Sequence, residues 1–113
     1  MAGVPFDQRD GVIWMNGEMV PWADAKVHVL THGLHYASAV FEGERAYGGE
    51  IFKLTEHTER LHESARLLGF KIPYTVSEID DACRKVLTAQ GYSDAYVRPI
   101  AWRGSEMMGV SAQ

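Results

Sequence analysis

The sequence predicts an α+β domain in which two helices pack on an antiparallel sheet. Three observations support this fold class. Two pairs of strand-like segments flank the tight-turn dipeptides Asn16-Gly17 and Gly48-Gly49. Two amphipathic segments with helical periodicity follow them, and a last strand-like segment comes after the helices. The order strands, helix, helix, strand is typical of an antiparallel sheet with helices on one side. The 113 residues have room for one core, so we expect residues 1–113 to form a single domain.

The composition excludes several classes of protein. Apolar residues make up 46% and charged residues 23% of the chain, which is typical of a globular domain. The net charge of −4 provides no attraction to nucleic acid or to an anionic membrane. No apolar run approaches the ~20 residues of a membrane span, and the N-terminus does not resemble a signal peptide. Because the single cysteine, Cys83, cannot form an internal disulfide, we expect a cytoplasmic protein.

The strands are expected on either side of the two turns. The first hairpin should pair residues 12–15 with 19–22, and the second should join a strand over 39–47 to one over 50–54. Gly43 weakens the strand that contains it, which indicates a bulge or the close approach of another group. The last strand should cover residues 95–103, with Pro99 favouring an edge position or a nearby bulge.

Two helices are expected between the strands. Thr55 is a candidate N-cap for a helix that runs to about Leu68. The segment Ser77–Asp80 resembles a capping box and should start a second helix, which ends at Gly91. Cys83 lies on the apolar stripe of the second helix, so we expect it to pack in the core. Residues 24–35 show no clear period and are expected to form a loop, which could include a helical turn.

Two groups of residues are candidates for binding anions. Tyr96 and Arg98 share one face of the last strand, where a hydroxyl and a planar guanidinium could hold a carboxylate. A solvated sheet face with polar side chains is the alternative. Arg60, near a helix start, could bind a phosphate, or it could simply pair with Glu56 or Glu63.

Three of the five histidines invite a metal hypothesis. His28, His32 and His35 are spaced as on one helix face, but His32-Gly33 breaks a helix and no Cys or Asp ligands are adjacent. We therefore expect no metal site, and we expect these histidines to form hydrogen bonds in a loop.

Several short motifs occur in the order in which one family has them. The motifs are His35-Tyr36, Val40-Phe41-Glu42-Gly43 with Arg45, His57-x-x-Arg60-Leu61-x-x-Ser64-Ala65, Tyr96-Val97-Arg98-Pro99 and Met108-Gly109-Val110. Together they resemble the N-terminal lobe of the branched-chain amino acid aminotransferases, which are pyridoxal phosphate enzymes of the D-amino acid aminotransferase-like fold (class IV). The resemblance extends from about Ile13 to Val110.

The resemblance implies roles for the matched positions. Arg60 would bind the phosphate of pyridoxal 5′-phosphate, and Phe41 and Gly43 would form the pocket wall over the cofactor. Tyr96 and Arg98 would recognise carboxylates, with Arg98 suited to the distal carboxylate of glutamate or 2-oxoglutarate. Tyr36 and Val110 would reach the pocket of a neighbouring subunit in a homodimer.

The chain also departs from the family pattern. Family members bind the cofactor aldehyde through a lysine in a second, C-terminal lobe, and none of Lys26, Lys53, Lys71 and Lys85 matches that position. We therefore expect no catalytic residue in this chain, an inactive fragment and an active full-length parent. A D-amino acid aminotransferase, an aminodeoxychorismate lyase or a non-enzymatic homodimerising module are the alternatives. Glu44 stands where an apolar residue is frequent, and the sequence suggests no role for it.

Overall fold

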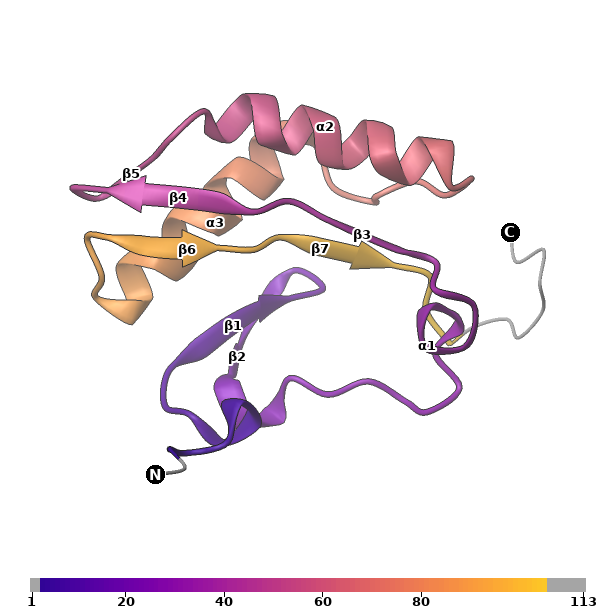
Figure 1. Cartoon of the computed structure of the whole chain (residues 1–113), viewed down its shortest axis with the longest axis horizontal. Helices are drawn as coiled ribbons and strands as arrows, with labels where there is room; N and C mark the ends of the chain where they lie inside the picture. Colours follow the sequence, from indigo (N-terminus) through magenta and orange to yellow (C-terminus); the bar gives the residue numbers. More distant parts are fainter. Residues whose placement is uncertain (1–2, 106–113) are drawn as a thin grey trace.

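The computed structural model describes residues 3–105 (Figure 1). The elements in chain order are η1 (Phe6–Gln8), β1 (Val12–Met15), β2 (Glu18–Pro21), η2 (Trp22–Asp24), α1 (His32–Tyr36), β3 (Ala39–Phe41), β4 (Glu44–Tyr47), β5 (Glu50–Ile51), α2 (Leu54–Leu67), α3 (Val76–Gln90), β6 (Ala95–Val97) and β7 (Ile100–Trp102). This mixture of antiparallel strands and helices confirms the predicted α+β class.

Both predicted hairpins are present. β1 pairs with β2 around Asn16 and Gly17, whose φ angles are 52° and 92°. β4 pairs with β5 around Gly48 and Gly49, with φ angles of 60° and 84°. These left-handed conformations explain the preference for Asn-Gly and Gly-Gly in two-residue turns.

The two long strands of the prediction are each interrupted in the middle. The first is divided into β3 and β4, and the second into β6 and β7. β3 pairs with β7 and β4 pairs with β6, both antiparallel, so the single sheet that we expected consists of three small sheets. The Glu42 N–H donates to the Pro99 carbonyl at 3.1 Å across the interruption. Because Pro99 has no N–H to return, the ladder breaks here, and the two interrupted runs continue side by side (Figure 1).

The helices follow the predicted order but begin differently. α2 starts after Lys53, which has a φ angle of 53° and provides no side-chain cap. Thr55 is therefore not the cap; its hydroxyl donates to Asp80 of α3 at 2.7 Å. The N-cap of α3 is Thr75, which forms a capping box with Glu78, so the prediction placed this box two residues too late.

The remaining features of the helices agree with the sequence. α3 is followed by its C-cap, Gly91, whose φ angle of 75° is the left-handed conformation expected after a helix. The predicted loop before residue 36 ends in the short helix α1.

The core lies between the two long helices and one face of the sheets. It is formed by Ala46, Leu54, Leu61, Ala65, Ile72, Ile79, Cys83, Leu87 and Val97. Cys83 is 7% exposed, and burial raises the pKa of its thiol to about 12, so it packs as a small apolar residue. In Figure 1 the helix α2 runs above β3 and β4, whereas the hairpin β1–β2 lies below β6 and β7. None of the helices among residues 3–105 has the length and hydropathy that a bilayer crossing requires.

Candidate functional site

The strands β3 and β4 present two different faces. On the inner face, towards the helices, Glu42, Glu44 and Ala46 are 5%, 0% and 1% exposed. On the outer face, Phe41 is 50% exposed, and the facing strand contributes Tyr96, which is 51% exposed. The alternation follows from the two-residue period of a strand, and it leaves the outer face open.

Four of the predicted substrate-binding residues lie together on this outer face. A Cβ atom on Gly43 would lie 2.9 Å from the Tyr96 hydroxyl oxygen and 3.2 Å from a carbon of its ring, so the glycine permits the close approach that the sequence suggested. The Arg98 guanidinium stacks on the Phe41 ring, with its central carbon 3.6 Å from the ring centroid. We call Phe41, Gly43, Tyr96 and Arg98 the outer-face cluster.

Arg60 pairs with a residue on the opposite side of the strand from the outer-face cluster. Its guanidinium forms an ion pair with Glu42, which points to the other side of the strand from Phe41. The Arg60 Nε lies 2.9 and 3.1 Å from the two Glu42 carboxylate oxygens, and Nη2 lies 2.7 Å from Oε1. The acidic partner is therefore Glu42 and neither Glu56 nor Glu63, the two candidates on the same helix.

The ion pair has a strongly asymmetric environment. Glu42 is 5% exposed, whereas the Arg60 side chain is 68% exposed. The His57 Nδ1 lies 2.6 Å from the same Glu42 oxygen. Hydrogen bonding from Arg60 lowers the pKa of Glu42, with a further lowering from His57, and burial opposes both. The carboxylate is thus held ionised under the surface, beneath an accessible cation.

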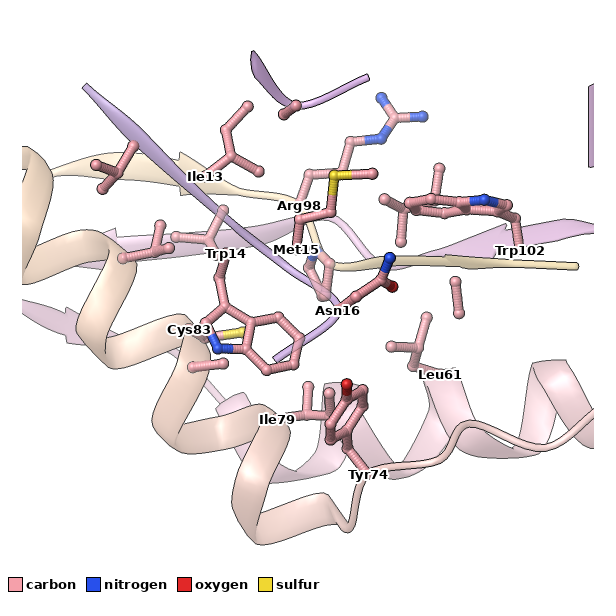
Figure 2. A pocket seen from close by; sticks show the side chains of 18 of the residues that line it. Ile13, Trp14, Met15, Asn16, Leu61, Tyr74, Ile79, Cys83, Arg98 and Trp102 are labelled. Atoms are coloured by element: carbon pink, nitrogen blue, oxygen red, sulfur yellow. The ribbon is translucent and has the colours of Figure 1, made fainter. Parts of the chain in front are cut away.

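A broad open cleft of about 1750 Å³ lies beside the outer-face cluster, between the hairpin β1–β2 and the rest of the domain. Its apolar wall includes Trp14, Leu61 and Tyr74, and Figure 2 shows Arg98 extending away from Leu61 and Tyr74. Tyr96 and Arg98 line the cleft, whereas Phe41, Gly43 and Arg60 do not.

The remaining predicted site residues lie elsewhere. Tyr36 is on α1 and is 43% exposed; the centroid of its ring lies 4.6 Å from that of His32. Val110 lies outside the described residues.

The three histidines of the metal hypothesis each form a separate hydrogen bond within or near the loop. His28 Nδ1 accepts from the Leu30 N–H, His35 Nε2 lies 2.7 Å from the Val29 carbonyl oxygen, and His32 Nδ1 lies 2.9 Å from the Ser38 hydroxyl. Within residues 3–105, no group of three or more His, Cys, Asp or Glu side chains is arranged to hold a metal ion.

The sequence analysis did not predict the roles of two residues of the site. Glu42 is the partner of Arg60, and His57 is a second partner of the Glu42 carboxylate. A signal for them was present. Glu42 shares its strand face with Val40 and Ala46, and an acid on an apolar face requires a cation or hydrogen-bond donors. His57 precedes Arg60 by one helical turn and therefore lies on the same side of α2.

Comparisons with known proteins agree with this arrangement. The family model for amino-transferase class IV matches residues 39–113. A probable branched-chain-amino-acid aminotransferase of Rickettsia typhi is 52% identical over 108 residues, which is 96% of this chain and 38% of that protein. The structure of the branched-chain amino acid aminotransferase from Escherichia coli superimposes with a TM-score of 0.88 and 42% identity, over 93% of this chain and 37% of that chain.

A second solved structure, from the archaeon Thermoproteus uzoniensis, is of a branched-chain aminotransferase with norvaline. It gives a TM-score of 0.84 at 36% identity, over 92% of this chain and 36% of that chain. A third, a branched-chain amino acid aminotransferase complexed with N-(5′-phosphopyridoxyl)-L-glutamate, gives a TM-score of 0.86 at 44% identity, over 90% of this chain and 36% of that chain.

These matches establish that the chain belongs to the class IV amino-transferase family. Within that family it corresponds to the N-terminal part of the branched-chain amino acid aminotransferases. It spans little more than a third of the length of the relatives that it matches.

Proposed function

We propose that the full-length protein containing this chain transfers an amino group between Leu, Ile or Val and 2-oxoglutarate, giving branched-chain 2-oxo acids and glutamate. The chain would form its N-terminal lobe and would be inactive alone, since the reactive lysine is expected in a C-terminal lobe. The observation that carries the proposal is the outer-face cluster, in which Phe41, Gly43, Tyr96 and Arg98 gather apolar, hydroxyl and cationic groups on one exposed surface.

Arg60 has the chemistry needed to bind a cofactor phosphate. Glu42 occupies the Nε and Nη2 side of its guanidinium, so Nη1 keeps its N–H groups without a partner among residues 3–105. An exposed guanidinium edge binds a phosphate with two parallel hydrogen bonds. The residues present therefore fit pyridoxal 5′-phosphate, and when bound it would supply the electron sink for transamination.

The outer-face cluster would serve both kinds of substrate. Phe41 and Gly43 would form an apolar wall that accepts a branched aliphatic side chain. Tyr96 and Arg98 would bind carboxylates, and Arg98 would meet the distal carboxylate of glutamate with its planar fork. Tyr36 and Val110 would complete the pocket of a second subunit in a homodimer.

A substrate panel on the full-length protein tests this proposal. Supplied with pyridoxal 5′-phosphate, it should convert Leu, Ile and Val with 2-oxoglutarate and leave D-alanine untouched. A preference for D-alanine, or lyase activity without amino transfer, would reject the branched-chain assignment. No turnover of any amino acid would favour a non-enzymatic homodimerising module.

An Arg98 variant sharpens the same experiment. Arg98→Met keeps an apolar stem against Phe41 and removes the cation, so the KM for 2-oxoglutarate should rise about tenfold or more while the KM for leucine changes little. Equal losses for both substrates would show that Arg98 does not distinguish the dicarboxylate.

A further inference from the structure

The ion pair between Glu42 and Arg60 differs from an ordinary surface salt bridge, because its carboxylate is buried and binds the guanidinium side-on through several hydrogen bonds. We propose that Glu42, supported by His57, is a positioning residue that fixes the Arg60 guanidinium with its free Nη1 edge turned towards the cofactor phosphate. This inference rests on the proposed function, because it assumes that Arg60 meets that phosphate.

The hydrogen bonds define which edge of the guanidinium is used. Both Glu42 oxygens accept from Nε, at 2.9 and 3.1 Å, and Oε1 also accepts from Nη2 at 2.7 Å. This side-on pairing restrains the rotation of the guanidinium plane about the last bonds of the long side chain. Nη1 lies in the same plane but away from the Nε–Nη2 edge that Glu42 occupies, and is left for a second anion.

The burial of the partners shows which of them is the anchor. Glu42 is 5% exposed, and its backbone N–H is tied to the Pro99 carbonyl at 3.1 Å, at the point where the two strand runs are interrupted. His57 is 21% exposed, and its Nδ1 lies 2.6 Å from Glu42 Oε1. Arg60 is 68% exposed and would be mobile without the carboxylate. The fixed acid therefore sets the position of the exposed cation.

A second arginine on the same helix provides an internal comparison. Arg66 pairs with Glu63 one turn away, and the two side chains are 68% and 53% exposed. That pair joins neighbours on one helix surface, has no buried partner and needs no further role. The Glu42–Arg60 pair instead joins the end of β3 to α2, and a buried carboxylate is costly unless a specific interaction holds it.

The test measures cofactor affinity in the full-length protein. Dissociation constants for pyridoxal 5′-phosphate and for pyridoxal, which lacks the phosphate, are determined by absorbance for the wild type, Glu42→Gln, and the control Glu63→Gln. Glu42→Gln should weaken binding of the phosphorylated form about tenfold, the loss expected for a charged hydrogen bond, and leave pyridoxal unchanged. Glu63→Gln should change neither affinity.

Two further variants separate positioning from other effects. In an Arg60→Ala background, adding Glu42→Gln should produce no further loss for the phosphorylated form, because Glu42 acts only through Arg60. His57→Asn should give a smaller loss in the same direction. If Glu42→Gln does not fold, as an altered pyridoxal affinity would reveal, Glu42→Asp changes the same geometry by one methylene.

The outcomes are distinguishable. Unchanged or tighter binding of pyridoxal 5′-phosphate by Glu42→Gln would overturn the inference. The carboxylate would then only be neutralising part of the positive charge of Arg60. The proposed role of Arg60 itself would be overturned by two results together: the wild type binds pyridoxal 5′-phosphate and pyridoxal with equal affinity, and Arg60→Ala changes neither affinity.

Discussion

Glu44 is the residue whose environment is least favourable. It is 0% exposed on the inner face of β4, and neither carboxyl oxygen has a hydrogen-bond partner among residues 3–105. Asp80 and Glu42 add negative charge around it; His57 partly offsets this, and the nearby Cys83 thiol is only a weak donor. Burial, the largest of these effects, raises the pKa of Glu44 from 4.5 to about 7.

This pKa predicts how the stability of the chain depends on pH. Between pH 4.5 and about 7 the folded state holds the Glu44 proton that the unfolded state has lost, so stability falls as the pH rises through this window. Glu44→Gln cannot ionise, and its stability relative to the wild type should increase by about 3 kcal/mol from pH 4.5 to pH 8. Urea denaturation at both pH values measures the difference; a stability difference that is independent of pH would contradict the raised pKa.

The site was partly predictable because its contacts follow the period of a strand. Phe41 and Gly43 share a face by alternation, as do Tyr96 and Arg98. The glycine at position 43 indicated a bulge or the close approach of another group, and the structure identifies that group as Tyr96. The partner of Arg60 was not predictable in the same way. Glu42 is 18 residues away, whereas Glu56 and Glu63 are helical neighbours, and only the folded register brings the distant acid closer.

At the scale of elements, the two long helices are joined by a buried polar contact. Asp80 of α3 is 5% exposed and accepts hydrogen bonds from the hydroxyls of Thr55 and Thr58 on α2, at 2.7 and 2.5 Å. Thr58 is 0% exposed and also donates to the Leu54 carbonyl. One buried acid thus ties the first turns of α2 to α3.

Removing this acid should loosen the helix pair. Asp80→Ala leaves the buried Thr58 hydroxyl with one acceptor fewer and opens a small cavity, so we expect a loss of about 2–4 kcal/mol in the free energy of unfolding. Thermal and urea denaturation provide the measurement. Asp81→Ala is the matched control, because Asp81 pairs with Arg84 at the exposed surface and its removal should change stability by less than about 0.5 kcal/mol. Equal effects of the two substitutions would contradict a structural role for Asp80.

The helix starts show why the fold was predictable in outline and less so in detail. Periodicity located both helices, and the turn dipeptides located both hairpins, because these signals are local. Thr55 looked like a cap, yet its hydroxyl is used by Asp80, a residue that the chain brings near only after folding. Similarly, Pro99 and Gly43 were each expected to disturb their own strands, but the alignment of the two breaks with each other depends on how the two runs pair.

At the scale of the whole molecule, one face of the sheets exposes several large apolar side chains within the described residues 3–105. The outer face of β3, β4, β6 and β7 exposes Phe41, Tyr47, Tyr96 and Ile100 at 50%, 58%, 51% and 49%. Large apolar side chains that gather on one exposed face often mark an interface. Because Tyr96 and Phe41 belong to the proposed site, the same surface would be closed by the remainder of the full-length protein or by a second subunit.

The 113-residue chain produced by itself should therefore self-associate through this face. We expect its apparent mass in light scattering to rise with concentration, since a second copy is then the available apolar partner. Ile100→Lys places a charge on the outer face, where association would bury it, and should keep the chain monomeric. Leu67→Lys makes the same kind of change on α2, where Leu67 is 71% exposed, and should leave association unaltered. A wild-type chain that stays monomeric at high concentration, or two variants that behave alike, would show that the outer face is not the surface through which copies of this chain associate.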